Sequence, residues 1–151
     1  MGKINDKLRV LIADPCEETM ELLVALFAYK GYAVESASDR AEAVATAARF
    51  GPDAIFTSIV DVDPCGRNLG LTLRSLPQTA GSMIVAVTNY GNLKDDPATT
   101  AGFDHFFIRP VALELILGTM AHLTGYNGKT VPLIKIPLHK FYSLPVRACD
   151  G

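Results

Sequence analysis

Five short apolar runs, each separated from the next by a stretch of a different periodicity, constrain the fold of this chain more than any other feature. In chain order they are Arg9 to Ala13, Tyr32 to Ala37, Ala54 to Ile59, Met83 to Thr88 and His105 to Arg109. Short apolar runs bounded by turn residues are typical of buried strands in parallel sheets. Because helical patterns separate the runs, the sequence predicts an α/β fold, a doubly wound five-stranded parallel sheet between two helical layers.

The helices are marked by residues that start and stop them. Asp39 and Glu42 form a capping box ahead of an alanine-rich helix that Gly51 ends. The stretch 89–103 has the weakest helical signal, and we expect only a short helix there. After Pro110, an apolar face predicts a last helix that closes near Gly125.

Charge and proline divide the chain into a domain and an extension. Residues 1–124 carry 10 Lys or Arg against 15 Asp or Glu, whereas residues 125–151 carry four against one. Three prolines prevent a continuous helix in the extension, yet it is too apolar for a solvated linker. We therefore expect residues 1–124 to fold as one domain, with 125–151 as an extended C-terminal arm. That arm could dock on the domain, on a second copy, or on a sheet edge of a partner.

Composition also excludes several classes of function. The acidic domain argues against nucleic-acid binding, and no apolar run approaches the length of a membrane span. The N-terminus lacks the apolar core of a signal peptide, so we expect a cytoplasmic protein with three reduced thiols. No glycine-rich phosphate loop or metal-ligand spacing predicts a cofactor.

In doubly wound sheets ligands bind outside the carboxyl ends of the strands, so the residues that follow each strand are the candidate site. Those positions hold Asp14-Pro15, Ser58, Thr88 and Arg109-Pro110. Their order and spacing, with Pro52-Asp53 before Ser58 and Gly66 eight residues after it, resemble the receiver domain of two-component response regulators. This resemblance covers about residues 7–124 and implies the CheY-like, flavodoxin-like (βα)5 fold.

The resemblance also shows what has changed at the site. Receivers carry an acidic pair, a phospho-accepting aspartate, a threonine or serine and a lysine, where this chain has Asp14-Pro15, Ser58, Thr88 and Arg109. Phosphoryl transfer depends on positioned charge and Mg²⁺, which prefers several carboxylates. We therefore interpret these five positions as a degenerate phosphorylation site. We expect no catalytic residue, weak or absent Mg²⁺ binding and no aspartyl phosphate.

These observations favour a phosphorylation-independent pseudo-receiver in phosphorelay signal transduction that acts through protein partners or as a homodimer. A flavodoxin-like small-molecule binder or enzyme using the strand-end pocket is the first alternative. The second is residual, non-standard phosphorylation on Ser58, Asp61 or Asp63, two aspartates that could also replace lost metal ligands.

Structural roles remain open for the same residues. Arg109 keeps a positive charge that needs a partner, and we expect an ion pair with Asp14. Asp14 could instead cap a helix that has Pro15 in its first position. Ser58 and Thr88 could simply fill space and satisfy backbone groups at strand ends.

Overall fold

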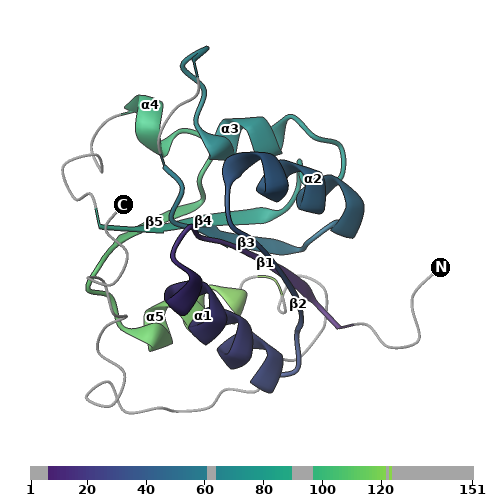
Figure 1. Ribbon diagram of the computed structural model, residues 1–151, viewed down its shortest axis with the longest axis vertical. Helices are drawn as coiled ribbons and strands as arrows, with labels where there is room; N and C mark the ends of the chain where they lie inside the picture. The colour runs from purple at the N-terminus through teal and green to yellow at the C-terminus, as the bar shows by residue number, and fades with distance from the viewer. Residues whose placement is uncertain (1–6, 61–63, 90–96, 122, 124–151) are drawn as a thin grey trace.

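The computed structural model describes residues 7–60, 64–89, 97–121 and 123 of the 151-residue chain. Five strands form one sheet in the order β2-β1-β3-β4-β5, and every neighbouring pair is parallel (Figure 1). Their bounds are β1 Arg9–Ala13, β2 Ala33–Ala37, β3 Ala54–Thr57, β4 Met83–Thr88 and β5 His105–Ile108. The predicted doubly wound parallel sheet is confirmed.

Helices cover both faces of this sheet, which gives the three layers expected. Their bounds are α1 Glu17–Tyr29, α2 Arg40–Phe50, α3 Leu69–Arg74, α4 Pro97–Thr100 and α5 Leu113–Gly118. In Figure 1, α1 and α5 lie below the sheet, and α2, α3 and α4 lie above it. No helix in the described part of the chain is both long and apolar enough to cross a membrane.

The strands separate two cores because successive side chains point to opposite faces of the sheet. On β1, Val10 and Ile12 belong to the core under α1 and α5, whereas Leu11 and Ala13 belong to the core under α2 and α3. Phe27 of α1 anchors the first core, with its ring centroid 4.9 Å from that of Phe56. Each central strand is thus buried on both faces, as its continuous apolar sequence predicted.

The predicted start of α2 is confirmed, with one additional contact. The Asp39 carboxylate accepts a hydrogen bond from the Glu42 amide at 2.8 Å. The Glu42 carboxylate in turn accepts from the amide and the hydroxyl of Ser38, both at 2.9 Å. Asp39 therefore caps the helix, and Glu42 fastens the chain just before it.

The sequence predicted that α4 is short and that the last helix is longer. The four-residue α4 fits the weak helical signal of its region, although Asp96, its expected cap, lies outside the described residues. The helix α5 ends at Gly118, but Met120, Ala121 and Leu123 are helical again, and Gly125 lies outside the described residues, so closure of the last helix near Gly125 stays a prediction. At the break between the two helical parts, the Thr119 hydroxyl donates to the Ile116 carbonyl at 2.7 Å, and glycine weakens the preceding turn.

At the outer edge of β2, the strand is tied to the helix above it by charge. Arg49 of α2 donates to the carboxylate of Glu35 on β2, with 2.5 Å between Nη2 and Oε1. This hydrogen bond lowers the pKa of Glu35, so the pair persists at neutral pH.

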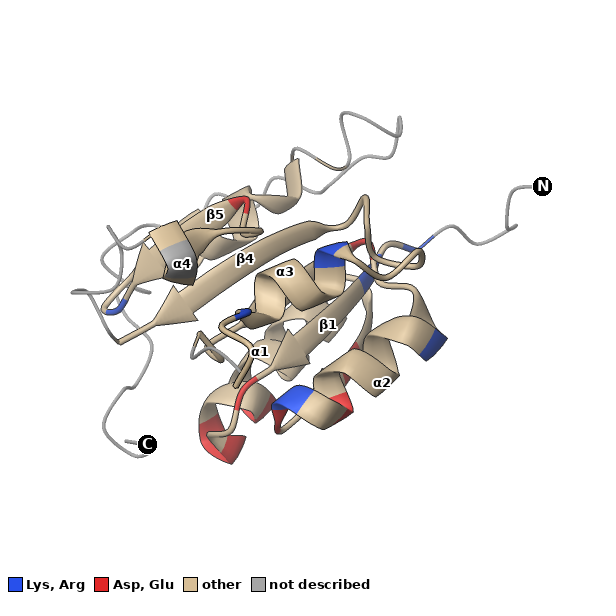
Figure 2. Ribbon diagram, turned by 90° about the horizontal axis from the view of Figure 1, so that it is seen from above, with Lys and Arg blue, Asp and Glu red and all other residues tan. Residues whose placement is uncertain are grey.

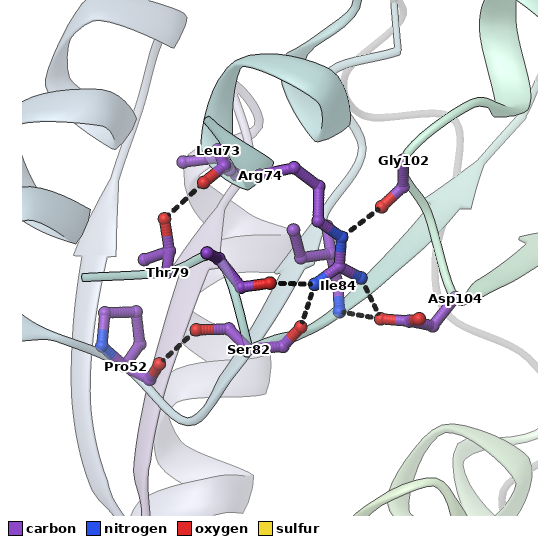
Figure 3. Close-up of polar contacts among 9 residues, drawn as sticks. Pro52, Leu73, Arg74, Thr79, Ser82, Ile84, Gly102 and Asp104 are labelled. Carbon is purple, nitrogen blue, oxygen red and sulfur yellow. Dashed lines mark hydrogen bonds and ion pairs between the residues drawn. The ribbon is translucent and has the colours of Figure 1, made fainter. Parts of the chain in front are cut away.

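Arg74, at the end of α3, joins three segments at the amino-terminal edge of β4 and β5 (Figure 3). Its guanidinium donates to three backbone carbonyls, those of Ala80, Ser82 and Gly102, at 3.0, 2.6 and 3.2 Å. It also forms an ion pair with Asp104, whose Oδ2 accepts from the Ile84 amide at 2.8 Å. One side chain therefore fixes α3 against both the start of β4 and the loop that leads into β5.

Gly102 lies against the backbone at the start of α3. Its φ is +86°, and a Cβ at this position would lie 2.7 Å from the backbone of Gly70 and Leu71. Because backbone atoms cannot rotate away as a side chain can, a methyl group fits only if α3 moves. This contact requires glycine for both its conformation and its size.

We predict that Gly102→Ala lowers the free energy of unfolding by about 1–3 kcal/mol, through the positive φ and the forced shift of α3. Gly118→Ala is the matched control, because nothing lies within 4 Å of its added methyl group. The control should be neutral or raise stability by up to about 1 kcal/mol. Urea denaturation measures both, and equal midpoints for the two variants would contradict the close approach.

Candidate functional site

Parallel strands bring the residues that follow them to one edge of the sheet, and three of the five predicted site residues meet there. Asp14 follows β1, Ser58 follows β3 and Arg109 follows β5. All three line one small internal space. Its remaining lining residues are Ile12, Leu23, Phe56, Thr57 and Val87.

A buried ion pair crosses this edge. Nη2 of Arg109 lies 3.2 Å from Oδ2 of Asp14, and the two side chains are only 6% and 4% exposed. Since β3 and β4 lie between β1 and β5, the pair bridges the ends of strands that are not neighbours. The predicted Asp14–Arg109 ion pair is confirmed.

Both carboxylate oxygens of Asp14 are engaged. Oδ2 meets Arg109, and Oδ1 accepts a hydrogen bond from the Cys16 amide at 2.8 Å. On the other side of the pair, the buried Nε of Arg109 has no hydrogen-bond partner within the described residues. The carboxylate is thus satisfied, whereas the guanidinium is only partly so.

Hydrogen bonds of the backbone, and one side-chain hydroxyl, fix the ends of β3 and β4. Ser58 is half-buried, and its amide donates to the Ala13 carbonyl at 3.1 Å. Thr57, which the sequence did not single out, accepts from the Ile59 amide through its hydroxyl at 2.9 Å. Thr88 is 1% exposed, and its carbonyl accepts from the Arg109 amide at 2.7 Å. These contacts hold the strand ends close beneath the ion pair.

The space around the ion pair is narrow. Between its eight described lining residues there is no volume for the centre of a water molecule. The guanidinium and the carboxylate therefore meet without room for a solvent molecule, which strengthens their attraction.

The start of α1 differs from the prediction that Asp14 caps this helix with Pro15 in its first position. The N-cap is Cys16, whose sulfur accepts from the Thr19 amide at 3.5 Å and from the Thr19 hydroxyl at 3.2 Å. Asp14 instead closes a turn with the amide two residues on, and Pro15 is exposed between them. Asp14 is therefore free of the capping role and available to Arg109.

The cysteines differ from one another. Cys65 is exposed and is not part of a disulfide. Cys16 is disulfide-bonded, and the other cysteine of that bond lies outside the described residues. The expectation of three reduced thiols is therefore wrong for Cys16.

Comparison with known proteins places this geometry in a structural class. No family model and no curated protein matches the sequence. A response regulator from Desulfuromonas acetoxidans matches in structure with a TM-score of 0.67 at 19% identity, over 79% of this chain and 98% of that chain. Chemotaxis response regulator CheY4 of Vibrio cholerae matches with a TM-score of 0.66 at 22% identity, over 78% and 99%. The chain has the receiver-domain fold.

Metal binding is a property in which this chain can be compared with a solved structure of the same fold. Response regulator protein TrrA from Thermotoga maritima, solved in complex with Mg²⁺-BeF, matches with a TM-score of 0.63 at 18% identity, over 77% of this chain and 98% of that chain. In the present receiver fold, no group of three or more His, Cys, Asp or Glu among the described residues could hold a metal. Asp61 and Asp63 lie outside the described residues.

The residues described at the edge of this receiver fold do not fit Mg²⁺. Pro15 and Ser58 offer no carboxylate, and both oxygens of Asp14 are already bonded. The Arg109 guanidinium also stands where a cation would have to approach Asp14, and like charges repel. Mg²⁺ requires an octahedron of oxygen ligands, so one occupied carboxylate is a poor starting set.

We predict that the pair behaves as a buried, coupled unit in a double-mutant cycle of Asp14→Asn and Arg109→Met. Each single substitution leaves the other partner buried without its counterpart and should lower the free energy of unfolding by about 3–5 kcal/mol. The double variant should lose much less than the sum, because no uncompensated charge remains.

Urea denaturation at neutral pH measures this cycle. The exposed pair of Arg49 and Glu35 serves as the control and should show almost no coupling. Additive effects of Asp14→Asn and Arg109→Met would contradict a strong buried interaction.

Proposed function

We propose that the protein is an atypical receiver-like signalling protein that works without phosphorylation and acts by binding protein partners. The observation that carries this proposal is the buried Asp14–Arg109 pair, which occupies the strand-end edge where Ser58 replaces an acceptor carboxylate. The receiver fold supports a role in two-component signalling. The proposal includes no enzymatic activity and no bound cofactor.

The chemistry of phosphoryl transfer supports the loss of phosphorylation. Transfer to a carboxylate needs a nucleophile and a metal ion to neutralise the phosphoryl oxygens. Ser58 carries a hydroxyl, which needs a neighbouring base to attack at neutral pH. The adjacent Asp14 cannot serve as that base while it is bonded to Arg109 and to the Cys16 amide.

The ion pair also suggests how this protein signals without phosphorylation. A phosphorylated receiver gains a new charged group at this edge, and its loops respond. In this protein a permanent internal contact already ties the end of β1 to the end of β5. We infer that the edge is held in one arrangement, so that signalling depends on whether a partner is present. A homodimer remains one form that such a partner can take.

The closed edge makes a small-molecule site there less favourable than protein binding. Ligand pockets generally offer hundreds of cubic ångströms, whereas the described lining of this space leaves no room for water. A cytoplasmic location stays a prediction, and the disulfide of Cys16 counts against it because such bonds are rare in reducing compartments.

Incubation with Mg²⁺ and either acetyl phosphate or beryllium fluoride tests the proposal. We expect an unchanged intact mass and no saturable amide NMR shifts at Asp14, Ser58 or Thr88. A phosphoryl group found on Ser58, or on Asp61 or Asp63, would overturn the proposal and establish residual phosphorylation instead.

A variant with the receiver residues restored supplies the positive control. Pro15→Asp, Ser58→Asp and Arg109→Lys together return the acidic pair, the acceptor and the lysine that receivers carry. This variant should show saturable Mg²⁺-dependent shifts, which the natural chain should lack under the same conditions. Equal Mg²⁺ responses in both proteins would show that the substitutions at these positions do not decide metal binding.

A further inference from the structure

The large apolar side chains that are exposed in the described part of the chain all belong to one helical layer. They are Leu22 and Tyr29 of α1, which are 39% and 83% exposed, and Leu115 of α5, which is 55% exposed. Both helices lie below the sheet in Figure 1. A single exposed apolar residue is ordinary, whereas a continuous apolar patch marks an interaction surface.

On α1 the exposed apolar residues form such a patch. Leu23 and Phe27 are buried in the core between this helix and the sheet. With 3.6 residues per turn, Leu22, Ala25 and Tyr29 lie on the opposite side of the helix, and all three are exposed. These three residues form the apolar stripe of α1, which runs over about two helical turns.

The two ends of α1 carry opposite charge. Glu17, Glu18 and Glu21 are exposed near its start, and none of them forms an ion pair with another described residue. Figure 2 shows the start of the helix in the red of Asp and Glu. Lys30, directly after the helix, likewise has no ion pair in the part of the chain that the structure describes. The apolar stripe therefore lies between an acidic and a basic end.

We propose that the apolar stripe of α1 is a contact between two copies of this chain, with the two α1 helices packed antiparallel about a two-fold axis near Ala25. This inference rests on the proposed function, since it names the protein partner as a second copy. A two-fold axis sets one surface patch against itself, so the patch has to be complementary to itself.

The side chains of the stripe match one another in size in this arrangement. An axis near Ala25 brings Leu22 of each copy level with Tyr29 of the other copy. The small side chain of Ala25 lies between these two pairs, where the helices approach each other most closely. Large side chains on either side of a small one allow two helices to interdigitate.

Charge favours the antiparallel direction. Parallel helices would place the glutamates of one copy beside those of the other, and like charges repel. In the antiparallel pair the two Glu18 side chains are about 20 Å apart along the helices, which exceeds the screening length of about 8 Å at physiological ionic strength. The same direction brings Lys30 of each copy level with Glu21 of the other. Opposite charges therefore meet at both ends of the contact.

The length of α1 limits the strength of this contact. Its thirteen residues give a helix about 20 Å long. Stable interfaces bury about 1,200–2,000 Å² in total, and a contact of one such helix per copy lies at or below the low end of this range. We therefore expect a reversible dimer that forms at high protein concentration.

Sedimentation equilibrium of the full-length chain between about 1 µM and 1 mM tests the proposal. We expect the average mass to rise towards that of two copies, and the amide NMR shifts of residues 22–29 to change with concentration. Ala25→Glu places two carboxylates together near the axis. This variant should raise the dissociation constant of the dimer at least about tenfold, because like charges then meet in the centre of the contact.

Ala45→Glu is the matched control, because Ala45 is also exposed but belongs to α2, on the other face of the sheet. It should leave the dissociation constant as in the natural chain. A chain that stays monomeric at every concentration would overturn the proposal, and so would equal effects of the two substitutions.

The phosphorylation experiment described above separates this inference from the proposed function. A monomer that takes no phosphoryl group would disprove the α1 contact and leave the proposed function intact. A dimer that Ala25→Glu dissociates, in a chain that does take a phosphoryl group, would support the α1 contact and overturn the proposed function. Shifts of the α1 amides of a monomer on addition of a lysine-rich amphipathic peptide would contradict the α1 dimer and assign the stripe to a basic partner.

Discussion

The parallel direction of all five strands sends every carboxyl end to the same edge of the sheet, and the character of this protein depends on what meets there. Asp14 and Arg109 are 95 positions apart in the sequence and follow strands that are separated by two others. A buried charge needs a partner, because removing it from water is costly. The pair satisfies that need and ties the first strand of the domain to the last.

This contact gives physical meaning to the substitutions around it. A site with several carboxylates repels itself unless a cation is present, and that repulsion makes a receiver dependent on metal and phosphoryl group. Here Pro15 and Ser58 reduce the negative charge, and Arg109 supplies an internal cation to the carboxylate that remains. The charge of the Asp14 carboxylate is consequently balanced by another residue of the same chain.

The two edge strands of the sheet, β2 and β5, have different surroundings. β2 is flanked by the long helices α1 and α2 and carries a charged pair, whereas β5 lies beside the four-residue helix α4 and carries aromatic side chains. Arg74 stiffens the amino-terminal end of this second edge by tying α3 to β4 and to the loop before β5.

The sequence by itself determined the features that depend on neighbours along the chain. Apolar runs and their spacing predicted the five strands and their parallel direction. The Asp39–Glu42 box predicted the start of α2, and the residue types after each strand predicted that Asp14 is the one acidic residue among the five site positions. Each of these is set within a few residues, so local pattern is enough.

Some residues have two possible roles of similar local energy, and only the tertiary structure decided between these roles. The sequence allowed Asp14 either to cap α1 or to pair with Arg109. In the structure Cys16 occupies the N-cap position, and Asp14 pairs with Arg109. The hydroxyl contact of Thr57 and the need for glycine at position 102 likewise follow from the close of β3 and the approach of α3. These contacts have one physical reason in common. Each depends on burial between segments that are far apart in the sequence, so no short stretch of sequence contains both partners.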